Sequence, residues 1–381
     1  MTGGSDVWIR GVARTPYGVQ PGTDTLGWQV RAARAALDDA DLEPGAVDGL
    51  LVGYSTTTPH LMPANAFAER LGIRPAIALG ASVGGATGLA MVATASALVQ
   101  AGRARRVLVV AGEDRASGRS RAATTATLAD VGHPDLEVPL GATVPAYYGL
   151  LASRYLADRG LGPRDLAALA VPQRVHASRT PGAQFTDLVS EADVLEARMI
   201  ANPLTLLQCC PVSDGGAAIL VSAAADARAP AIVGLGSANR HQHLSTLDPS
   251  RTGAGDAAAM ALGEAGISRE EIDVLAVYDS FTVTLAMILE ETGFVAPGMS
   301  GASARGGRFG LDGDLPLNTH GGLMSYGHCG VAGGLAHLVE AVLQLRHDRP
   351  GHQVVRPRYA YVHAEGGVLS AHVALVLRAA T

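Results

Sequence analysis

The sequence predicts an α/β protein built from two pseudo-symmetric halves, and three observations lead to this prediction. An internal repeat aligns residues 35–55 with residues 260–280 without gaps. Two further segments, 84–99 and 330–345, open with glycine and continue as small and apolar residues in a helical pattern. The composition, with 48% hydrophobic residues, 47 glycines and only 4% aromatic residues, favours close packing of helices on sheets through small side chains.

Taken in chain order, each copy of the repeat predicts an amphipathic helix, a turn and a buried strand. The strands fall at residues 49–55 and 274–280. The glycine-opened helices come next, and each precedes a second strand, at residues 105–114 and 359–367. We expect the two glycine-opened helices to be buried between the halves, at the centre of the molecule.

A region punctuated by glycine and proline, from about residue 112 to 228, separates the two halves. Two interpretations stay open: a loop insertion that folds over one face and shapes a substrate pocket, or ordinary helical segments without that role. The predicted domains are residues 1–228, an N-terminal half that includes the insertion, and residues 229–381, a C-terminal half.

The charged residues exclude several classes of function. The chain contains no lysine, so all 29 basic residues are arginine. This rules out Schiff-base chemistry and the lysine of a phosphate-binding loop. A net charge of −6 without a basic run argues against nucleic-acid binding. The N-terminal sequence lacks the features of a signal peptide, and no apolar run approaches a membrane span, so we expect a soluble, cytoplasmic protein that does not bind membranes.

The thiols and imidazoles predict neither a disulfide framework nor a bound metal. Cys209, Cys210 and Cys329 match no zinc-site spacing. His241 and His243 form a close pair in a polar loop, but no third ligand lies near them in sequence. We expect no metal, and we interpret Cys209 and Cys210 as core residues.

Five segments in order along the chain resemble the thiolase superfamily, in particular its sterol-carrier-type, thiolase-like branch: residues 7–18, 202–221, 277–282, 319–334 and 362–370. The resemblance implies the thiolase fold, with the two halves in a five-layered α-β-α-β-α arrangement. It also implies a tight homodimer and a coenzyme A thioester substrate. Coenzyme A is then part of the substrate, and no cofactor is permanently bound.

Thiolases use a cysteine at the N-terminus of the first central helix as their nucleophile, activated by the helix dipole and backbone amides. The resemblance places this cysteine on Gly85, so the nucleophile position is vacated. The hydroxyls of Ser82 and Thr87 are near in sequence. A nucleophilic Ser82 breaks the match at Thr87, and a structural hydroxyl that caps the helix is the favoured interpretation.

Other thiolase groups are partly retained. The resemblance identifies His328 as the histidine that donates a hydrogen bond to the thioester carbonyl and stabilises an enolate. The asparagine that orders a water of the oxyanion hole is replaced by Tyr278. The second thiolase cysteine, the acid/base, falls on His363 or within a residue of it.

A tyrosine pair, Tyr278 and Tyr326, then becomes the candidate for acid/base catalysis. This pattern resembles the thiolase-like aldolases of steroid side-chain degradation, which carry a tyrosine pair in place of the thiolase cysteines. Asp279 or His328 could instead be the working base, because a phenol of ordinary pKa is a poor base at neutral pH. Both tyrosines could also be core residues with satisfied hydroxyls.

Loss of both cysteines removes the covalent step of a thiolase, whereas a retro-aldol cleavage needs no nucleophile. The sequence therefore predicts an aldolase that splits a β-hydroxyacyl-CoA into a ketone or aldehyde and a shorter acyl-CoA. Two alternatives stay open: an acyltransferase that uses a displaced nucleophile, Cys329 or Ser82, and a non-catalytic scaffold. The resemblance further implies a small zinc-ribbon/OB-fold partner protein that forms a heterotetramer with the homodimer.

Overall fold

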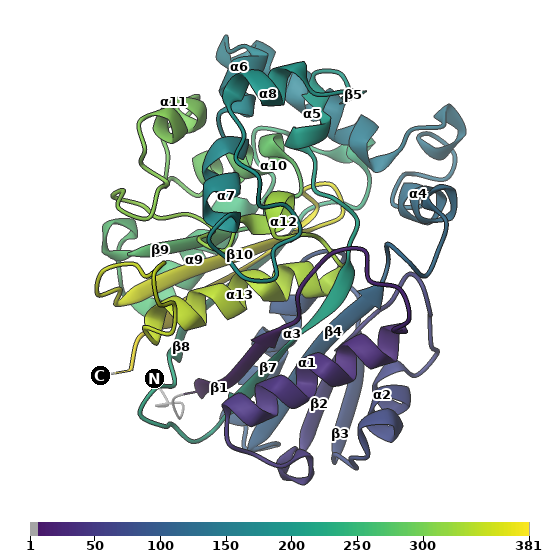
Figure 1. Cartoon of the computed structure of the whole chain (residues 1–381), viewed down its shortest axis with the longest axis vertical. Helices are drawn as coiled ribbons and strands as arrows, with labels where there is room; N and C mark the ends of the chain where they lie inside the picture. The colour runs from purple at the N-terminus through teal and green to yellow at the C-terminus, as the bar shows by residue number, and fades with distance from the viewer. Residues whose placement is uncertain (1–6, 381) are drawn as a thin grey trace.

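A sheet of nine strands runs through the molecule (Figure 1), and the computed structural model describes residues 7–380, apart from the side chains of residues 121, 124 and 125. In chain order the strands are β1 (Val7–Arg14), β2 (Gly49–Gly53), β3 (Ile77–Ala81), β4 (Arg106–Asp114), β7 (Asp214–Ser222), β8 (Ala231–Asn239), β9 (Val274–Val277), β10 (Tyr359–Gly366) and β11 (Ala371–Arg378). They lie side by side in the order β3-β2-β4-β7-β1-β8-β11-β10-β9.

The strand order shows the pseudo-symmetry that the internal repeat predicts. The N-terminal half contributes β2-β4-β7-β1, and the C-terminal half contributes β9-β10-β11-β8 in the same arrangement. In both halves the first two strands of this order pair in parallel and the others antiparallel. The halves meet where β1 pairs with β8, at Val7 with Ile232 and Trp8 with Ala231.

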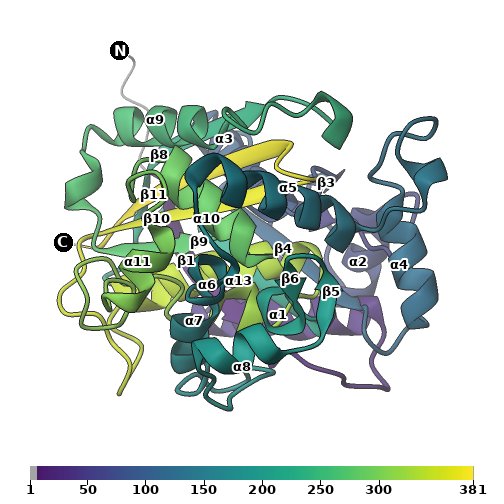
Figure 2. The ribbon, with the colours of Figure 1, turned by 90° about the horizontal axis from the view of Figure 1, so that it is seen from above.

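Helices cover the sheet in layers (Figures 1 and 2). They are α1 (Thr25–Asp39), α2 (Pro63–Leu71), α3 (Thr87–Gln100), α9 (Ala254–Ala265), α10 (Thr282–Glu291) and α13 (Val331–Leu345). The largest apolar core joins α3 and α13 to strands of both halves, so these glycine-opened helices form the central layer. Separate cores lie under α1 and α2 on one outer face and under α9 and α10 on the other. The expected five-layered thiolase fold is confirmed.

The segment between β4 and β7 forms a helical region at the top of Figure 1. It holds α4 (Arg121–Ala129), α5 (Val144–Arg159), α6 (Pro163–Ala167), α7 (Ala170–Ala177), α8 (Glu191–Glu196) and the short strands β5 (Met199–Ala201) and β6 (Leu204–Thr205). Its helices pack on α10, α11 (Ser300–Arg305) and α12 (Gly322–Ser325) of the C-terminal half. The segment therefore folds as helices over one face, and the interpretation that it shapes a substrate pocket stays a prediction. The segment is shorter than predicted, because the apolar residues of β7 are buried between β4 and β1 in the sheet.

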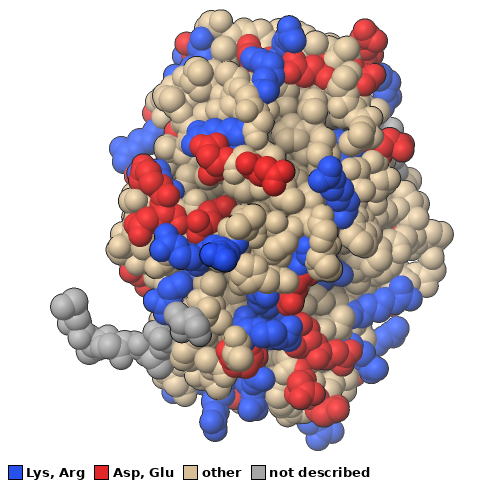
Figure 3. All heavy atoms as spheres, turned by 60° about the vertical axis from the view of Figure 1, so that its left-hand side comes forward, with Lys and Arg blue, Asp and Glu red and all other residues tan. Residues whose placement is uncertain are grey.

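Two surface features bear on function. β3 is an edge strand that pairs only with β2, and its Leu79 is 47% exposed. On the face seen in Figure 3, arginine and acidic side chains alternate without a continuous basic area. None of the helices between residues 7 and 380 has both the length and the apolar character that a membrane crossing requires.

Candidate active site

The candidate site lies where the two central helices begin. Gly88 and Gly334 let α3 and α13 approach closely: a Cβ atom on Gly88 would lie 2.8 Å from Cγ of Leu335, and one on Gly334 would lie 2.9 Å from the carbonyl oxygen of Gly85. Larger residues would force the helices apart. The glycines in the sequence therefore bring the two helix N-termini together around Gly85.

The phenol of Tyr278 fills the space beside Gly85. A Cβ atom on Gly85 would lie 2.6 Å from Cζ of Tyr278, closer still to the hydroxyl oxygen, and 2.5 Å from the carbonyl oxygen of Glu365. Tyr278 follows directly after β9 and is only 3% exposed. The position where the resemblance places the thiolase cysteine thus has no room for a side chain while this phenol is present.

Tyr278 and His328 form the hydrogen-bonded pair of the site. The Tyr278 hydroxyl oxygen and Nε2 of His328 lie 3.1 Å apart, with the two rings at 89°. Burial, together with the charge of Arg115, lowers the pKa of His328 to about 3, whereas burial raises the pKa of Tyr278 well above its usual range. Both groups are therefore neutral, and the imidazole can accept a hydrogen bond from the phenol.

Glu365 is a buried carboxyl group beside this pair that the sequence reasoning missed. Its side chain accepts hydrogen bonds from the hydroxyl of Tyr148, at 2.8 Å, and from the backbone N–H of Leu369, at 3.1 Å. Burial raises the pKa of Glu365 to about 7. Among the neighbouring charged groups, Glu365 raises the pKa of Tyr278 the most. Since Tyr148 belongs to α5, the insertion reaches the site. Glu365 was missed because a single acidic residue at a strand end is not a distinctive sequence signal.

Asp279 is held by structural contacts rather than directed at the Tyr278–His328 pair. Its carboxylate accepts hydrogen bonds from the backbone N–H groups of Leu323, at 2.7 Å, and Met324, at 3.4 Å, in the short helix α12. Nε2 of His337 lies 3.3 Å from the same carboxylate. These contacts engage both carboxylate oxygens, so Asp279 has a structural role, and its role as a base stays a prediction.

Tyr326 is not in contact with Tyr278. Its hydroxyl donates to the carbonyl oxygen of Thr15 at 2.9 Å, and the guanidinium of Arg14 lies 4.8 Å from its ring centre. Two buried histidine rings, His320 and His337, lie between the two tyrosines at centre-to-centre distances of 4.9 to 6.2 Å. The structure therefore separates the tyrosine pair that the resemblance suggested.

His363 also lies apart from the Tyr278 hydroxyl. Its Nε2 is 3.2 Å from Nδ1 of His372 on the neighbouring strand, and its ring stacks with that of Tyr361. The contact of His363 with Tyr278 is through the backbone: the carbonyl oxygen of His363 accepts a hydrogen bond from the N–H of Tyr278. Its side chain is placed in the outer core with Tyr361.

The candidate nucleophiles are unsuited to attack in this conformation. Cys329 is fully buried, and burial raises the pKa of its thiol above the usual range. Burial also raises the pKa of Cys209, to about 12, and that of Cys210. Ser82 is exposed, on the chain just before the Gly85 turn. Thr87 donates to the carbonyl oxygen of Gly84 and accepts the N–H of Val83, so its hydroxyl is structural. The predicted capping role is wrong, because Ala86 is the N-cap of α3 and no side chain caps that helix.

The His241–His243 loop holds no assembled metal site. Nε2 of His241 lies 3.1 Å from the carbonyl oxygen of Val368, and the ring of His243 packs on that of His133. Between residues 7 and 380, no three or more histidine, cysteine, aspartate or glutamate side chains cluster as metal ligands do.

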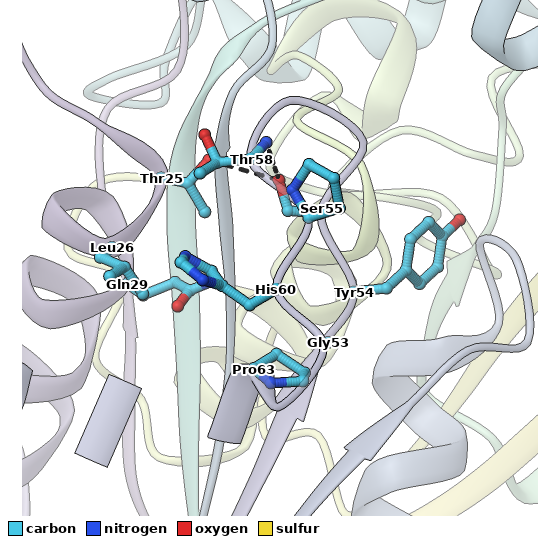
Figure 4. A pocket seen from close by; sticks show the side chains of 10 residues that line it. Thr25, Leu26, Gln29, Gly53, Tyr54, Ser55, Thr58, His60 and Pro63 are labelled. Atoms are coloured by element: carbon cyan, nitrogen blue, oxygen red, sulfur yellow. Dashed lines mark hydrogen bonds between the residues drawn. The ribbon is translucent and has the colours of Figure 1, made fainter. Parts of the chain in front are cut away.

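A small cavity of about 70 Å³ opens at the end of β2, next to the site (Figure 4). The hydroxyl-bearing residues Thr25, Ser55 and Thr58 line part of it, and the hydroxyl of Thr25 donates to the carboxylate of Asp114. Tyr54 points away from the other lining side chains. The cavity is too small for an acyl-CoA substrate.

Comparisons with known proteins agree with this geometry. The profile described as "Thiolase, N-terminal domain" matches residues 7–225, and "Thiolase C-terminal domain-like" matches residues 236–379. An acetyl-CoA acetyltransferase of Methanothermobacter thermautotrophicus is 27% identical over 95% of this chain and 96% of that protein. A steroid side-chain-cleaving aldolase of Thermomonospora curvata is 30% identical over 90% of this chain and 92% of its own length. Among solved structures, an Ltp2-ChsH2(DUF35) aldolase superimposes with a TM-score of 0.83 at 27% identity and covers 98% of both chains.

Proposed function

Because the chain belongs to the thiolase superfamily, we propose that it is a carbon–carbon lyase of that superfamily, an aldolase acting on acyl-CoA thioesters. It would cleave a β-hydroxyacyl-CoA into a ketone or aldehyde and a shorter acyl-CoA. The relatives include both aldolases and acetyltransferases, so similarity alone does not choose between these reactions. The observation that supports the aldolase is the Tyr278 phenol in the space where a side chain at position 85 would lie.

The proposed reaction needs a base, an acid and a group that stabilises an enolate. As the β-hydroxyl proton passes to the oxygen of Tyr278, the Cα–Cβ bond breaks, its electron pair forms the enolate of the shorter thioester, and the β-carbon leaves as a carbonyl compound. Tyr278 gives its own phenolic proton to the α-carbon, so no proton is gained or lost overall. Nε2 of His328, 3.1 Å from the phenol oxygen, orients the phenol by a hydrogen bond and stays neutral.

We also propose a homodimer and a small zinc-ribbon/OB-fold partner of the DUF35 type, joined as a heterotetramer. The partner is suggested by the similarity to the Ltp2-ChsH2(DUF35) aldolase. The unpaired edge of β3, with Leu79 exposed, offers a surface where a second copy could add its own strand. The expected compartment is the cytoplasm.

An acyltransferase that uses Cys329 or Ser82 is the second candidate, and the similarity to acetyl-CoA acetyltransferases favours it. A third is a scaffold that binds acyl-CoA without catalysis. A covalent acyl adduct detected by mass spectrometry after incubation with an acyl-CoA would support the acyltransferase. Binding without any product would support the scaffold.

The test is to co-express the chain with its genomic neighbours and to incubate the purified complex with a β-hydroxyacyl-CoA carrying a secondary or tertiary hydroxyl. Mass spectrometry follows the coenzyme A products, without added free coenzyme A. A shorter acyl-CoA together with a ketone or aldehyde supports the lyase, because thiolysis must consume free coenzyme A. Turnover only with a β-ketoacyl-CoA and free coenzyme A would overturn the proposal.

A further inference from the structure

Arg115 is a buried cation without a direct partner at the edge of the candidate site. It follows directly after β4 and is only 7% exposed. Its Nε is fully buried without a hydrogen-bond partner, and within residues 7–380 its guanidinium lies within 4 Å of no carboxylate. A buried charge is costly unless a counter-charge or hydrogen bonds compensate it. Such an arginine therefore indicates an anionic ligand or intermediate.

Glu113 is a neighbouring carboxylate, and one of its two oxygens is hydrogen-bonded elsewhere. Its Oε1 accepts hydrogen bonds from the hydroxyls of Ser55, at 3.0 Å, and Thr56, at 2.8 Å, and from backbone N–H groups of the same turn. Its Oε2 and Nη1 of Arg115 both face Gly330, the residue before α13, where a Cβ atom would overlap Oε2 and lie 3.8 Å from Nη1. Gly330 thus leaves open the space between the two charges.

The charge of Arg115 is directed at the same place as the Tyr278–His328 pair. It lowers the pKa of His328, and it opposes the rise in the pKa of Tyr278 that burial causes. The charge of Arg115 also opposes the rise that burial causes in the pKa of Tyr54, which borders the small cavity. In the structure, Nη1 of Arg115 lies beside Gly330, two residues after His328, so the cation stands next to the chain segment that carries the imidazole.

We infer that Arg115 is a further catalytic residue, whose guanidinium donates hydrogen bonds to the thioester oxygen and stabilises the enolate. The inference rests on the proposed function. Breaking the Cα–Cβ bond places a full negative charge on that oxygen, and Nε2 of His328 is already bonded to Tyr278. A guanidinium stays protonated in proteins and presents several donors, so it can hold the enolate without itself taking part in proton transfer.

The experiment uses acetoacetyl-CoA, whose enolate has a characteristic near-ultraviolet absorbance, with the wild-type complex and with Arg115→Gln and Arg115→Lys. In the wild type we expect the bound ligand to ionise at a lower pH than in solution. Arg115→Gln should reduce the enolisation constant, and the lyase kcat on a β-hydroxyacyl-CoA, by about 10²-fold, the usual loss for one oxyanion donor. Arg115→Lys should restore part of both, and Arg154→Gln, an exposed arginine of α5, is the control.

Folding is checked by thermal unfolding, where Arg115→Gln should be as stable as the wild type or more stable, because it removes an uncompensated charge. Equal enolisation in wild type and Arg115→Gln would overturn the inference, and so would the absence of any enolate in the wild type. If the wild type cleaves β-hydroxyacyl-CoA and Arg115→Gln does so equally well, the inference fails and the lyase stands. If no cleavage occurs but enolisation depends on Arg115, the lyase fails and the anion site stands.

Discussion

Gly85→Ala is the sharpest test of the site geometry, because it adds a single carbon where the phenol of Tyr278 lies. The new Cβ would be 2.6 Å from Cζ of Tyr278 and 2.5 Å from the carbonyl oxygen of Glu365. Neither neighbour moves freely, since Tyr278 is 3% exposed and the carbonyl belongs to the backbone of β10. The substitution must therefore displace the phenol, the helix entrance or both.

The magnitude follows from two opposing terms. Overpacking of a well-packed core costs about 1–3 kcal/mol. Replacing glycine by alanine at an unstrained position stabilises a protein by about 0.4–1 kcal/mol. Gly263→Ala measures this second term separately, because a Cβ atom on Gly263, in α9, meets nothing within 4 Å. We expect Gly85→Ala to lower the free energy of unfolding by about 1–3 kcal/mol relative to Gly263→Ala, because the glycine-to-alanine gain is common to both variants.

The assay combines urea unfolding with turnover of a β-hydroxyacyl-CoA. A phenol displaced by about 1 Å should lower kcat by about 10²-fold. In a Tyr278→Phe background, which removes the most overlapped atom, the stability cost of Gly85→Ala should fall by about 1 kcal/mol. If Gly85→Ala matches Gly263→Ala in stability and the wild type in turnover, the placement of the phenol beside Gly85 is wrong.

Three further predictions follow from the same contacts. Tyr278→Phe should lower kcat by about 10²–10⁴-fold. Tyr326→Phe should mainly lower the free energy of unfolding, by about 1 kcal/mol, because it removes the hydrogen bond to the carbonyl oxygen of Thr15. The control is Tyr361→Phe, because the buried hydroxyl of Tyr361 has no partner within the described residues. Equal losses of kcat in Tyr278→Phe and Tyr326→Phe would contradict this difference in roles. Burial raises the pKa of folded Glu365 from 4.5 to about 7. The free energy of unfolding of the wild type should therefore fall as the pH rises from about 5 to 8, by at most about 3 kcal/mol. Urea unfolding of Glu365→Gln at each pH should not show this fall. If the stability of wild type and Glu365→Gln changes with pH in the same way, the prediction is wrong. Asp279→Asn weakens the hydrogen bonds that the carboxylate accepts from α12, so thermal unfolding should show a loss of about 1–3 kcal/mol. An unchanged midpoint would show that Asp279 does not hold this helix.

Much of the fold could be predicted from the sequence, because its strongest signals are periodic and repeated. The repeat placed equivalent helices and strands in both halves, and the strand order of the sheet agrees. The glycine-opened helices are central because glycine is needed where α3 and α13 touch. The predicted insertion ran to about residue 228, whereas β7, Asp214–Ser222, is a buried strand of the sheet.

The site was predicted less completely, because neighbouring positions in sequence point into different surroundings. Tyr278 and Asp279 are adjacent, yet one phenol meets His328 while the carboxylate lies under α12. Tyr326 precedes His328 by two residues, but its hydroxyl is directed at the carbonyl of Thr15. Such directions depend on the backbone at the end of a strand or a short helix, which residue spacing does not specify.

The glycine at position 85 and the tyrosine at position 278 depend on each other. Tyr278 and Gly85 lie in different halves of the chain, and only the fold brings them together. A cysteine at position 85 would collide with the phenol, and removing the phenol alone would leave a gap without a thiol. Neither single substitution therefore yields the arrangement of a thiolase, and each damages the present one. This mutual dependence explains why a glycine, which has no side chain, can mark the proposed site, whose candidate acid/base phenol comes from the opposite half.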